Sequence, residues 1–346
     1  MPKSLLVFFL VLTMELGAQY TDQINSNRPG ASIGAFAVGK GVVQFEGGIA
    51  YRKYKHESYN YSSIDANLVF LSVRWGFLFE RLELTYQGGY IFDRLTNKIS
   101  SSEYSLKRKG FLQNYLGIKY QFFDPFKKGR EVNIYSWKAN NTFKLRDLIP
   151  AVSITAGANY ILGKNHYPFG DMFDLLYRPI FFQNLNLSPE KEPQLSLRGV
   201  LATQSHFFGT WVFVTNFIYD RYLTDYSEKS YILTLTHTFH PLWSVYLENQ
   251  GIFGERYNDL IFRTGAAYLL TDDIQVEGTF GIGARSDPSS VFINLGVSYR
   301  LDFHKSFTSA AEIEYKETKK EEKQLKKTVR KNNKAEKKRS RKAKKI

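Results

Sequence analysis

Apolar and polar residues alternate with a period of two along most of the chain between Val42 and Phe303. The last stretch is the clearest, since every second residue from Val291 to Phe303 is apolar. This period is typical of β-strands whose two faces meet different surroundings. The pattern predicts twelve strands, at 42–54, 64–76, 82–92, 111–122, 150–162, 193–204, 211–222, 231–240, 243–253, 258–270, 274–285 and 291–303.

The predicted strands are long enough to cross a membrane. They contain about 10–14 residues, whereas about 9–11 tilted residues span a bilayer and strands average about 5–6 residues in soluble proteins. In a transmembrane barrel the apolar faces meet lipid and the polar faces line the lumen. A soluble sheet with one wet face is the alternative explanation. The residues expected to line the lumen and contact a solute are Glu46, Arg52, Glu83, Gln87, Lys119, Arg198, Asp220, Glu248, Arg263, Glu277 and Arg300.

The connections and the tryptophans favour the membrane barrel. The loops expected outside are mostly longer than the turns expected in the periplasm, and 123–149 is a long exception. Trp75, Trp211 and Trp243 all fall at the periplasmic rim, as in an interfacial aromatic belt. We therefore expect an all-β fold, a transmembrane antiparallel up-and-down β-barrel of about 12 strands over 42–303, in the outer membrane with both termini periplasmic. The expected outer loops are 55–63, 93–110, 163–192, 223–230, 254–257 and 286–290.

Composition matters mainly at the two ends of the chain. The 346 residues include no cysteine, which excludes a disulfide framework, a thiolate zinc site and cysteine catalysis. Residues 1–18 have a basic start, a short apolar core and small residues at the end, which predicts a signal peptide. Most of the net charge of +14 belongs to 316–346. Residues 304–346 are expected to form a basic helical or disordered periplasmic tail. Within it, 316–346 are expected to contact a periplasmic protein or the cell wall. We do not expect a nucleic acid as partner.

Residues 19–41 precede the first predicted strand and are a candidate plug for the pore. A barrel of about 8 strands is filled by side chains and one of about 16 leaves an aqueous channel, so twelve strands predict a narrow pore. Arg28 is expected to enter the lumen and pair with Glu46, Glu248 or Glu277. The alternative is that Asn27-Arg28-Pro29 only makes a periplasmic turn.

Five stretches carry a family resemblance. They are INSNRPGASIGAFAVGKGVVQFEGGI at 24–49 and shorter motifs at 135–141, 148–153, 243–251 and 262–268. Together they resemble the outer-membrane transporters of the MetA-pathway phenol-degradation-like family, in the form found in Bacteroidota. The resemblance implies a channel for small, aromatic or hydrophobic compounds. It covers most of 24–303 and does not extend to the basic tail.

We therefore expect a channel for small solutes, without cofactor or metal. The alternative is an anchoring or assembly subunit whose tail binds a periplasmic partner. An enzyme is disfavoured, because His237, His240, Ser244 and Asn249 show no nucleophile motif. The lumen candidates carry both charge signs, which predicts weak charge selectivity, since a selective pore needs a ring of one sign.

Overall fold

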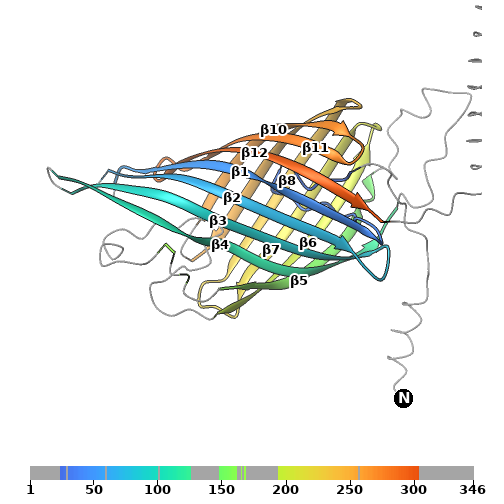
Figure 1. Cartoon of the computed structure of the whole chain (residues 1–346), viewed down its shortest axis with the longest axis horizontal. Coiled ribbons are helices and arrows are strands. Elements are labelled where there is room, and N and C mark those ends of the chain that lie inside the picture. The colour runs from blue at the N-terminus through green and yellow to red at the C-terminus, as the bar shows by residue number, and fades with distance from the viewer. Residues whose placement is uncertain are drawn as a thin grey trace, which may run out of the picture. The chain divides into compact units, whose positions relative to one another are not determined.

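A computed structural model describes residues 24–28, 30–58, 61–99, 102–125, 148–161, 165, 167–168, 194–255 and 258–303. In this part, twelve strands form one closed antiparallel barrel, in which sequence neighbours pair and β1 also pairs with β12 (Figure 1). The strands are β1 (Val42–His56), β2 (Ser62–Gly76), β3 (Leu82–Ile99), β4 (Ser102–Phe123), β5 (Ala151–Tyr160), β6 (Leu195–Phe207), β7 (Trp211–Tyr222), β8 (Glu228–His240), β9 (Trp243–Gly254), β10 (Asn258–Thr271), β11 (Ile274–Gly283) and β12 (Ser289–Asp302). The predicted up-and-down barrel is confirmed.

The barrel and the basic end of the chain are separate units. The first unit comprises Met1–Phe303 and the second His304–Ile346. The predicted signal peptide, the basic tail and residues 126–147 and 169–193 lie outside the described residues. Within the described part, no helix is long and apolar enough to cross a membrane.

One predicted loop is wrong. Residues 93–110 mostly continue β3 and β4, and this hairpin reaches beyond the rest of the barrel (Figure 1). Its pairing places Arg94 opposite Lys107 and Lys98 opposite Glu103. Because both faces are largely polar here, the apolar alternation fades while the backbone ladder continues, which is why the sequence pattern missed these strand ends.

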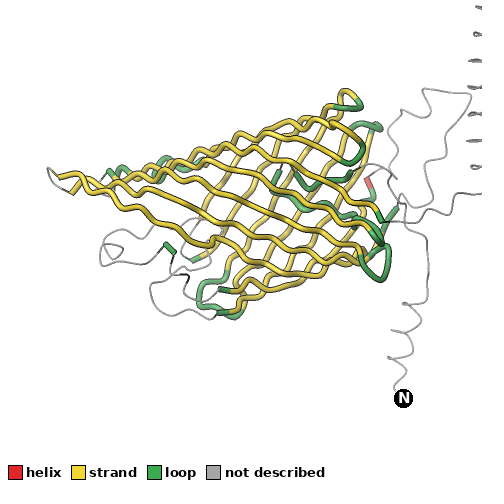
Figure 2. Tube along the Cα trace, viewed as in Figure 1, coloured by secondary structure: helices red, strands yellow, loops and turns green. Residues whose placement is uncertain are grey.

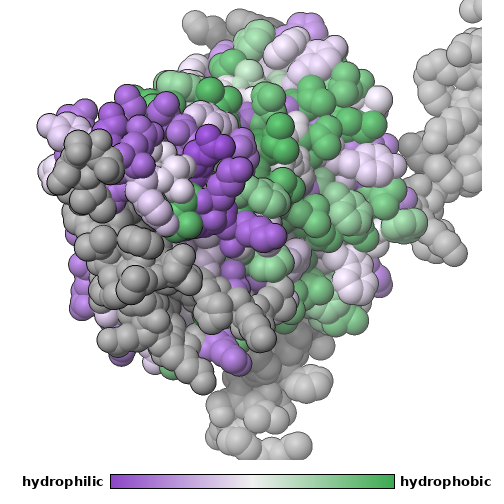
Figure 3. Space-filling view, turned by 60° about the vertical axis from the view of Figure 1, so that its left-hand side comes forward, coloured by the Kyte–Doolittle hydropathy of each residue, from purple (hydrophilic) through white to green (hydrophobic). Residues whose placement is uncertain are grey.

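The two faces of the wall have opposite chemistry. On β12 the side chains of Ile293, Leu295 and Val297 are 46–58% exposed on the outside, whereas those of Ser298 and Arg300 are at most 3% exposed and face inward. The space-filling view shows the same division, with apolar residues over the wall and polar residues at one end (Figure 3). Closure also leaves no open sheet edge, which lipid would not tolerate. This is the surface of a transmembrane barrel.

We call the rim where β1 begins and β12 ends the terminal rim, and the opposite one the far rim. Trp75 pairs with Val43 at the start of β1, and Trp211 and Trp243 open β7 and β9. All three tryptophans therefore lie at the terminal rim, as the sequence predicts.

Residues Ile24–Gly41, apart from Pro29, precede β1 and run as loop inside the strand wall (Figure 2). We call them the N-terminal segment.

Candidate functional site

The N-terminal segment is held in the lumen by carboxylates of the barrel wall. The backbone N–H groups of Ala31 and Ser32 donate to Glu248 Oε2 at 3.0 and 3.2 Å. Val38 N–H donates to Glu83 Oε2 at 3.0 Å, and an irregular buried backbone needs such acceptors. In the same way Asn27 N–H donates to Glu46 Oε1 at 3.1 Å. Wall carboxylates thus replace the hydrogen bonds that a helix or sheet would give this segment.

Side-chain amides hold the segment as well. Asn216 is fully buried, and its Oδ1 accepts from Ile33 N–H at 2.6 Å while its Nδ2 donates to Ile33 O at 2.8 Å. Gln204 and Gln121 accept from Ala35 N–H and Ala37 N–H at 3.0 and 3.3 Å. An amide offers a donor and an acceptor together, which suits irregular backbone. The sequence analysis missed these contacts, because an inward amide is also common in a wet pore.

A buried ionic network fixes the segment near the terminal rim. Arg74 donates from Nε to Glu83 Oε1 at 2.8 Å and lies 3.5 Å from Glu46, and all three side chains are at most 2% exposed. Arg74 Nη2 also donates to Phe36 O at 3.1 Å, and Lys119 Nζ donates to the same oxygen at 2.6 Å. Buried charges need such partners, and removing one leaves an uncompensated charge. Arg74 was missed in the sequence, although it is an inward cation near the end of its strand.

All eleven predicted lumen residues face the barrel interior. Eight are buried and three, Gln87, Arg198 and Asp220, are half-buried. They form several small groups rather than one ring. Arg263 donates to Glu248 at 2.7 Å and to Gln250 at 2.6 Å. Arg198 lies 3.6 Å from Asp220, and Arg300 donates to Asp302 at 3.0 Å.

Arg28 enters the lumen, and of its three predicted partners only Glu277 interacts with it. Its guanidinium lies 4.2 Å above the ring of Phe70. Among the described residues it forms no ion pair, and it acts on Glu277 only through a longer-range attraction. The expected pair with Glu46 or Glu248 is wrong, because those carboxylates bind Arg74, Arg263 and the backbone of the segment itself. Gly30 lies in the same bend. A residue with a side chain would be too close to the wall there, since its Cβ would lie 2.5 Å from Glu248 Oε2.

Two adjoining cavities lie against the segment. The larger has a volume of about 110 Å³, with Ala31 and Ile33 of the segment in its wall. The smaller has about 60 Å³ and shares Ala31, Leu112 and Arg198 with the first. A cavity of about 150 Å³ holds one benzene molecule, so this space suits a single small solute.

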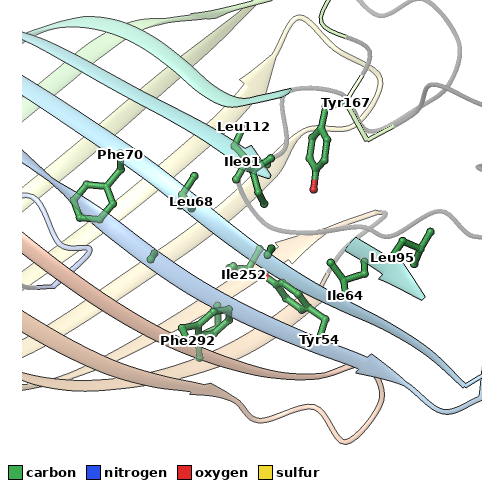
Figure 4. Close-up of a cluster of buried hydrophobic side chains, with 13 residues drawn as sticks. Tyr54, Ile64, Leu68, Phe70, Ile91, Leu95, Leu112, Tyr167, Ile252 and Phe292 are labelled. Carbon is green, nitrogen blue, oxygen red and sulfur yellow. The ribbon is translucent and has the colours of Figure 1, made fainter. Parts of the chain in front are cut away.

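Apolar side chains gather on the inner face between the cavities and the far rim (Figure 4). The cluster comprises Ala50, Tyr54, Ile64, Ala66, Leu68, Phe70, Ile91, Leu95, Leu112, Tyr167, Ile252, Ile261 and Phe292, each at most 9% exposed. Tyr167 comes from the connection between β5 and β6, and its hydroxyl donates to Asp93 at 2.6 Å. Burial raises the pKa of Tyr167 well above its usual value, so the phenol stays protonated as the donor. One sector of the lumen wall is therefore apolar between the cavities and the far rim, with buried charged residues such as Arg52 and Asp93 beside it.

The candidate catalytic set is not assembled. His237 stacks on Trp211 with ring centroids 4.2 Å apart and pairs with the outward Val245. Ser244 is the next residue along β9 and therefore faces the opposite side of the wall. Among the described residues, no group of three or more His, Asp or Glu side chains is placed to hold a metal ion.

Comparison with known families decides the relationship. The family described as putative MetA-pathway of phenol degradation matches residues 26–174 and 181–301. The chain belongs to this family. The resemblance read from its motifs is confirmed, and the match ends just before the basic tail, as expected. No curated protein matches the sequence.

Several solved outer-membrane barrels have a similar fold. An outer-membrane channel from Pseudomonas putida F1 is 13% identical, with a TM-score of 0.49, covering 81% of this chain and 100% of that one. The NanC porin is 11% identical with a TM-score of 0.44, covering 75% and 100%. The CymD monoaromatic hydrocarbon channel is 9% identical with a TM-score of 0.40, covering 77% and 90%.

Proposed function

We propose that this protein is an outer-membrane channel for small solutes, with a preference for compounds that have a hydrophobic or aromatic body. The N-terminal segment acts as a plug that closes the lumen toward the terminal rim. The observation that carries the proposal is the apolar cluster on the inner face. A pore for hydrophilic solutes has a polar interior, whereas here an apolar sector of the wall, beside buried charged residues such as Arg52 and Asp93, leads from the far rim to the cavities.

The terminal rim faces the periplasm in this proposal. The described turns at that rim are short, for example 208–210, 241–242 and 272–273, while the long β3–β4 hairpin belongs to the far rim. Outer-membrane barrels have short periplasmic turns and longer extracellular loops. The basic tail that follows Phe303 is then periplasmic.

Uptake by cells tests the channel. Cells with this protein in their outer membrane should take up labelled benzyl alcohol faster than cells without it, and glycerol uptake should change much less. Leu68→Gln places a polar group in the apolar cluster and should reduce only the benzyl alcohol uptake. Leu148→Gln changes an exposed leucine outside the lumen and is the matched control. Equal stimulation of both solutes, unaffected by Leu68→Gln, would remove the support for an apolar path.

An apolar groove lies on the outer face of the paired strands β4, β5 and β6, and we propose that such solutes pass into the membrane where this part of the wall opens. It has a volume of about 760 Å³ and is lined by small residues such as Ala156, Gly157 and Gly199, and by Arg198, which also borders both inner cavities. Ala156→Trp fills the groove from the lipid side without touching the N-terminal segment. It should slow uptake of benzyl alcohol, while Ile154→Trp on the same outward face of β5 should not. If both variants transport normally, the solute leaves by another route.

A further inference from the structure

The carboxylates of the lumen are occupied by the N-terminal segment. Glu46, Glu83 and Glu248 each accept a backbone N–H of this segment, and each also has an arginine partner in the wall. An acceptor that is already bound on several sides has little left to offer a solute. The charge of these three carboxylates is therefore used in holding the segment.

Cationic groups dominate the wall of the larger cavity. Four arginines line it, Arg28, Arg52, Arg198 and Arg263, against the single acidic residue Glu46. The carboxylates nearest to two of these arginines, Glu248 for Arg263 and Asp220 for Arg198, are not part of this wall. A solute in the cavity therefore meets guanidinium groups rather than carboxylates, although Arg263 and Arg198 are already paired with Glu248 and Asp220 behind the wall.

Aromatic rings stand beside two of the arginines. Arg28 lies over Phe70 of β2, and the guanidinium of Arg52 is 5.9 Å from the ring centroid of Phe292 of β12. Strand β1 lies between these two strands, so both rings border the same cavity. Guanidinium groups bind carboxylates through charge-assisted hydrogen bonds, and the neighbouring rings offer an apolar surface.

We propose that the larger cavity binds a small organic anion with an apolar body, such as an aromatic monocarboxylate, and that the N-terminal segment creates this preference by occupying the lumen carboxylates. This deepens the proposed channel function and rests on it. The cavity of about 110 Å³ adjoins the smaller one of about 60 Å³, and the two together offer room for one small molecule rather than an oligomer. Counted as one ring, the lumen charges predict weak selectivity, but their arrangement around the cavity favours anions.

Three probes with the same ring test the charge preference. Benzoate, benzyl alcohol and benzylamine are titrated into the full-length protein in detergent, and affinity is measured by calorimetry. Benzoate should bind most tightly and benzylamine most weakly. Arg52→Gln should weaken benzoate about tenfold to a hundredfold, the range for one hydrogen bond to a charged group, and leave benzyl alcohol unchanged.

Two further variants keep the test decisive. Arg28→Gln lies outside the strands, so it leaves the barrel intact if Arg52→Gln prevents folding, and it should also weaken benzoate selectively. Arg94→Gln removes an outward, exposed arginine and is the matched control. Benzyl alcohol binding as well as benzoate, with no effect of either lumen variant, would overturn the anion site and leave the channel standing. If none of the three probes binds, both the anion site and the proposed channel function are overturned.

Ion selectivity tests the part played by the segment. In a planar bilayer under a salt gradient, the full-length protein should show an anion-selective reversal potential. Deletion of 24–38 frees Glu46, Glu83 and Glu248 and should move the potential toward that of a non-selective pore. An unchanged potential would show that the segment does not set the preference, and a cation-selective full-length channel would contradict the cationic cavity.

Discussion

Replacing Asn216 by alanine should loosen the N-terminal segment while leaving the barrel folded. Asn216 exchanges two hydrogen bonds with the backbone of Ile33, at 2.6 and 2.8 Å, in a fully buried position. Leaving a buried donor or acceptor unpaired costs about 1–3 kcal/mol, so the closed state loses about 2–6 kcal/mol. Each 1.4 kcal/mol is a factor of ten, so the population with a released segment should rise about 30-fold or more.

Hydrogen–deuterium exchange measures this release directly. The Ile33 amide should exchange about 30-fold faster in Asn216→Ala, whereas amides of the strand ladder keep their protection. Asn97→Ala is the matched control, because Asn97 is also a buried inward asparagine but makes no hydrogen bond to the segment among the described residues. Unchanged exchange at Ile33 in a folded barrel would refute the reasoning that side-chain amides hold the segment closed.

Three more predictions concern the far rim and the tail. Asp287, partly exposed, accepts from the Ser58 hydroxyl and from Ser58 N–H and Glu57 N–H at 2.9 Å, and these hydrogen bonds lower its pKa. A pKa that is lowered in the folded state stabilises the contact at pH values above the unfolded pKa of about 3.9, and this stabilisation is lost as the pH falls through the folded pKa. Hydrogen exchange of the Ser58 amide, corrected for its intrinsic rate, should therefore rise in acid. In Asp287→Asn the exchange should lose this pH dependence. Tyr167→Phe removes the hydrogen bond to Asp93 and should cost about 1 kcal/mol of local stability, seen as faster proteolysis between β5 and β6, because Asp93 keeps Arg108 at 2.7 Å; equal cleavage rates would argue against Tyr167 as an anchor. Truncation after Phe303 should leave solute uptake unchanged if the protein is a channel only, and a loss of uptake together with a co-purified protein would favour the anchoring alternative.

The sequence could predict the barrel because lipid and lumen impose one simple rule on every strand. Alternation places Val291 and Ile293 outside and Arg300 inside. Because side chains alternate between the two faces of a strand, fixing which face is apolar also fixes the register of the strand. The strand ends of the β3–β4 hairpin were missed because that rule stops at the membrane surface. There, Asp93 and Arg94 are both polar although they lie on opposite faces.

The site was only partly predictable, because its partners are far apart in sequence. Alternation identifies Glu248 as inward, but it cannot show that this carboxylate holds Ala31, which lies 217 residues away. The same limit left three carboxylates open as partners of Arg28, since the pairing of Glu46 with Arg74 and of Glu248 with Arg263 depends on barrel geometry. Asn216 and Gln204 were invisible as contacts for a related reason, because their roles depend on where the segment passes.

Single-channel conductance of the full-length protein and of a chain lacking 24–38 tests most directly whether the segment closes this barrel. We expect small, infrequent openings from the full-length protein and a steady, several-fold larger conductance after the deletion. Equal conductance from two folded proteins would show that ions never needed to pass the segment, and the account of a plugged lumen would be wrong.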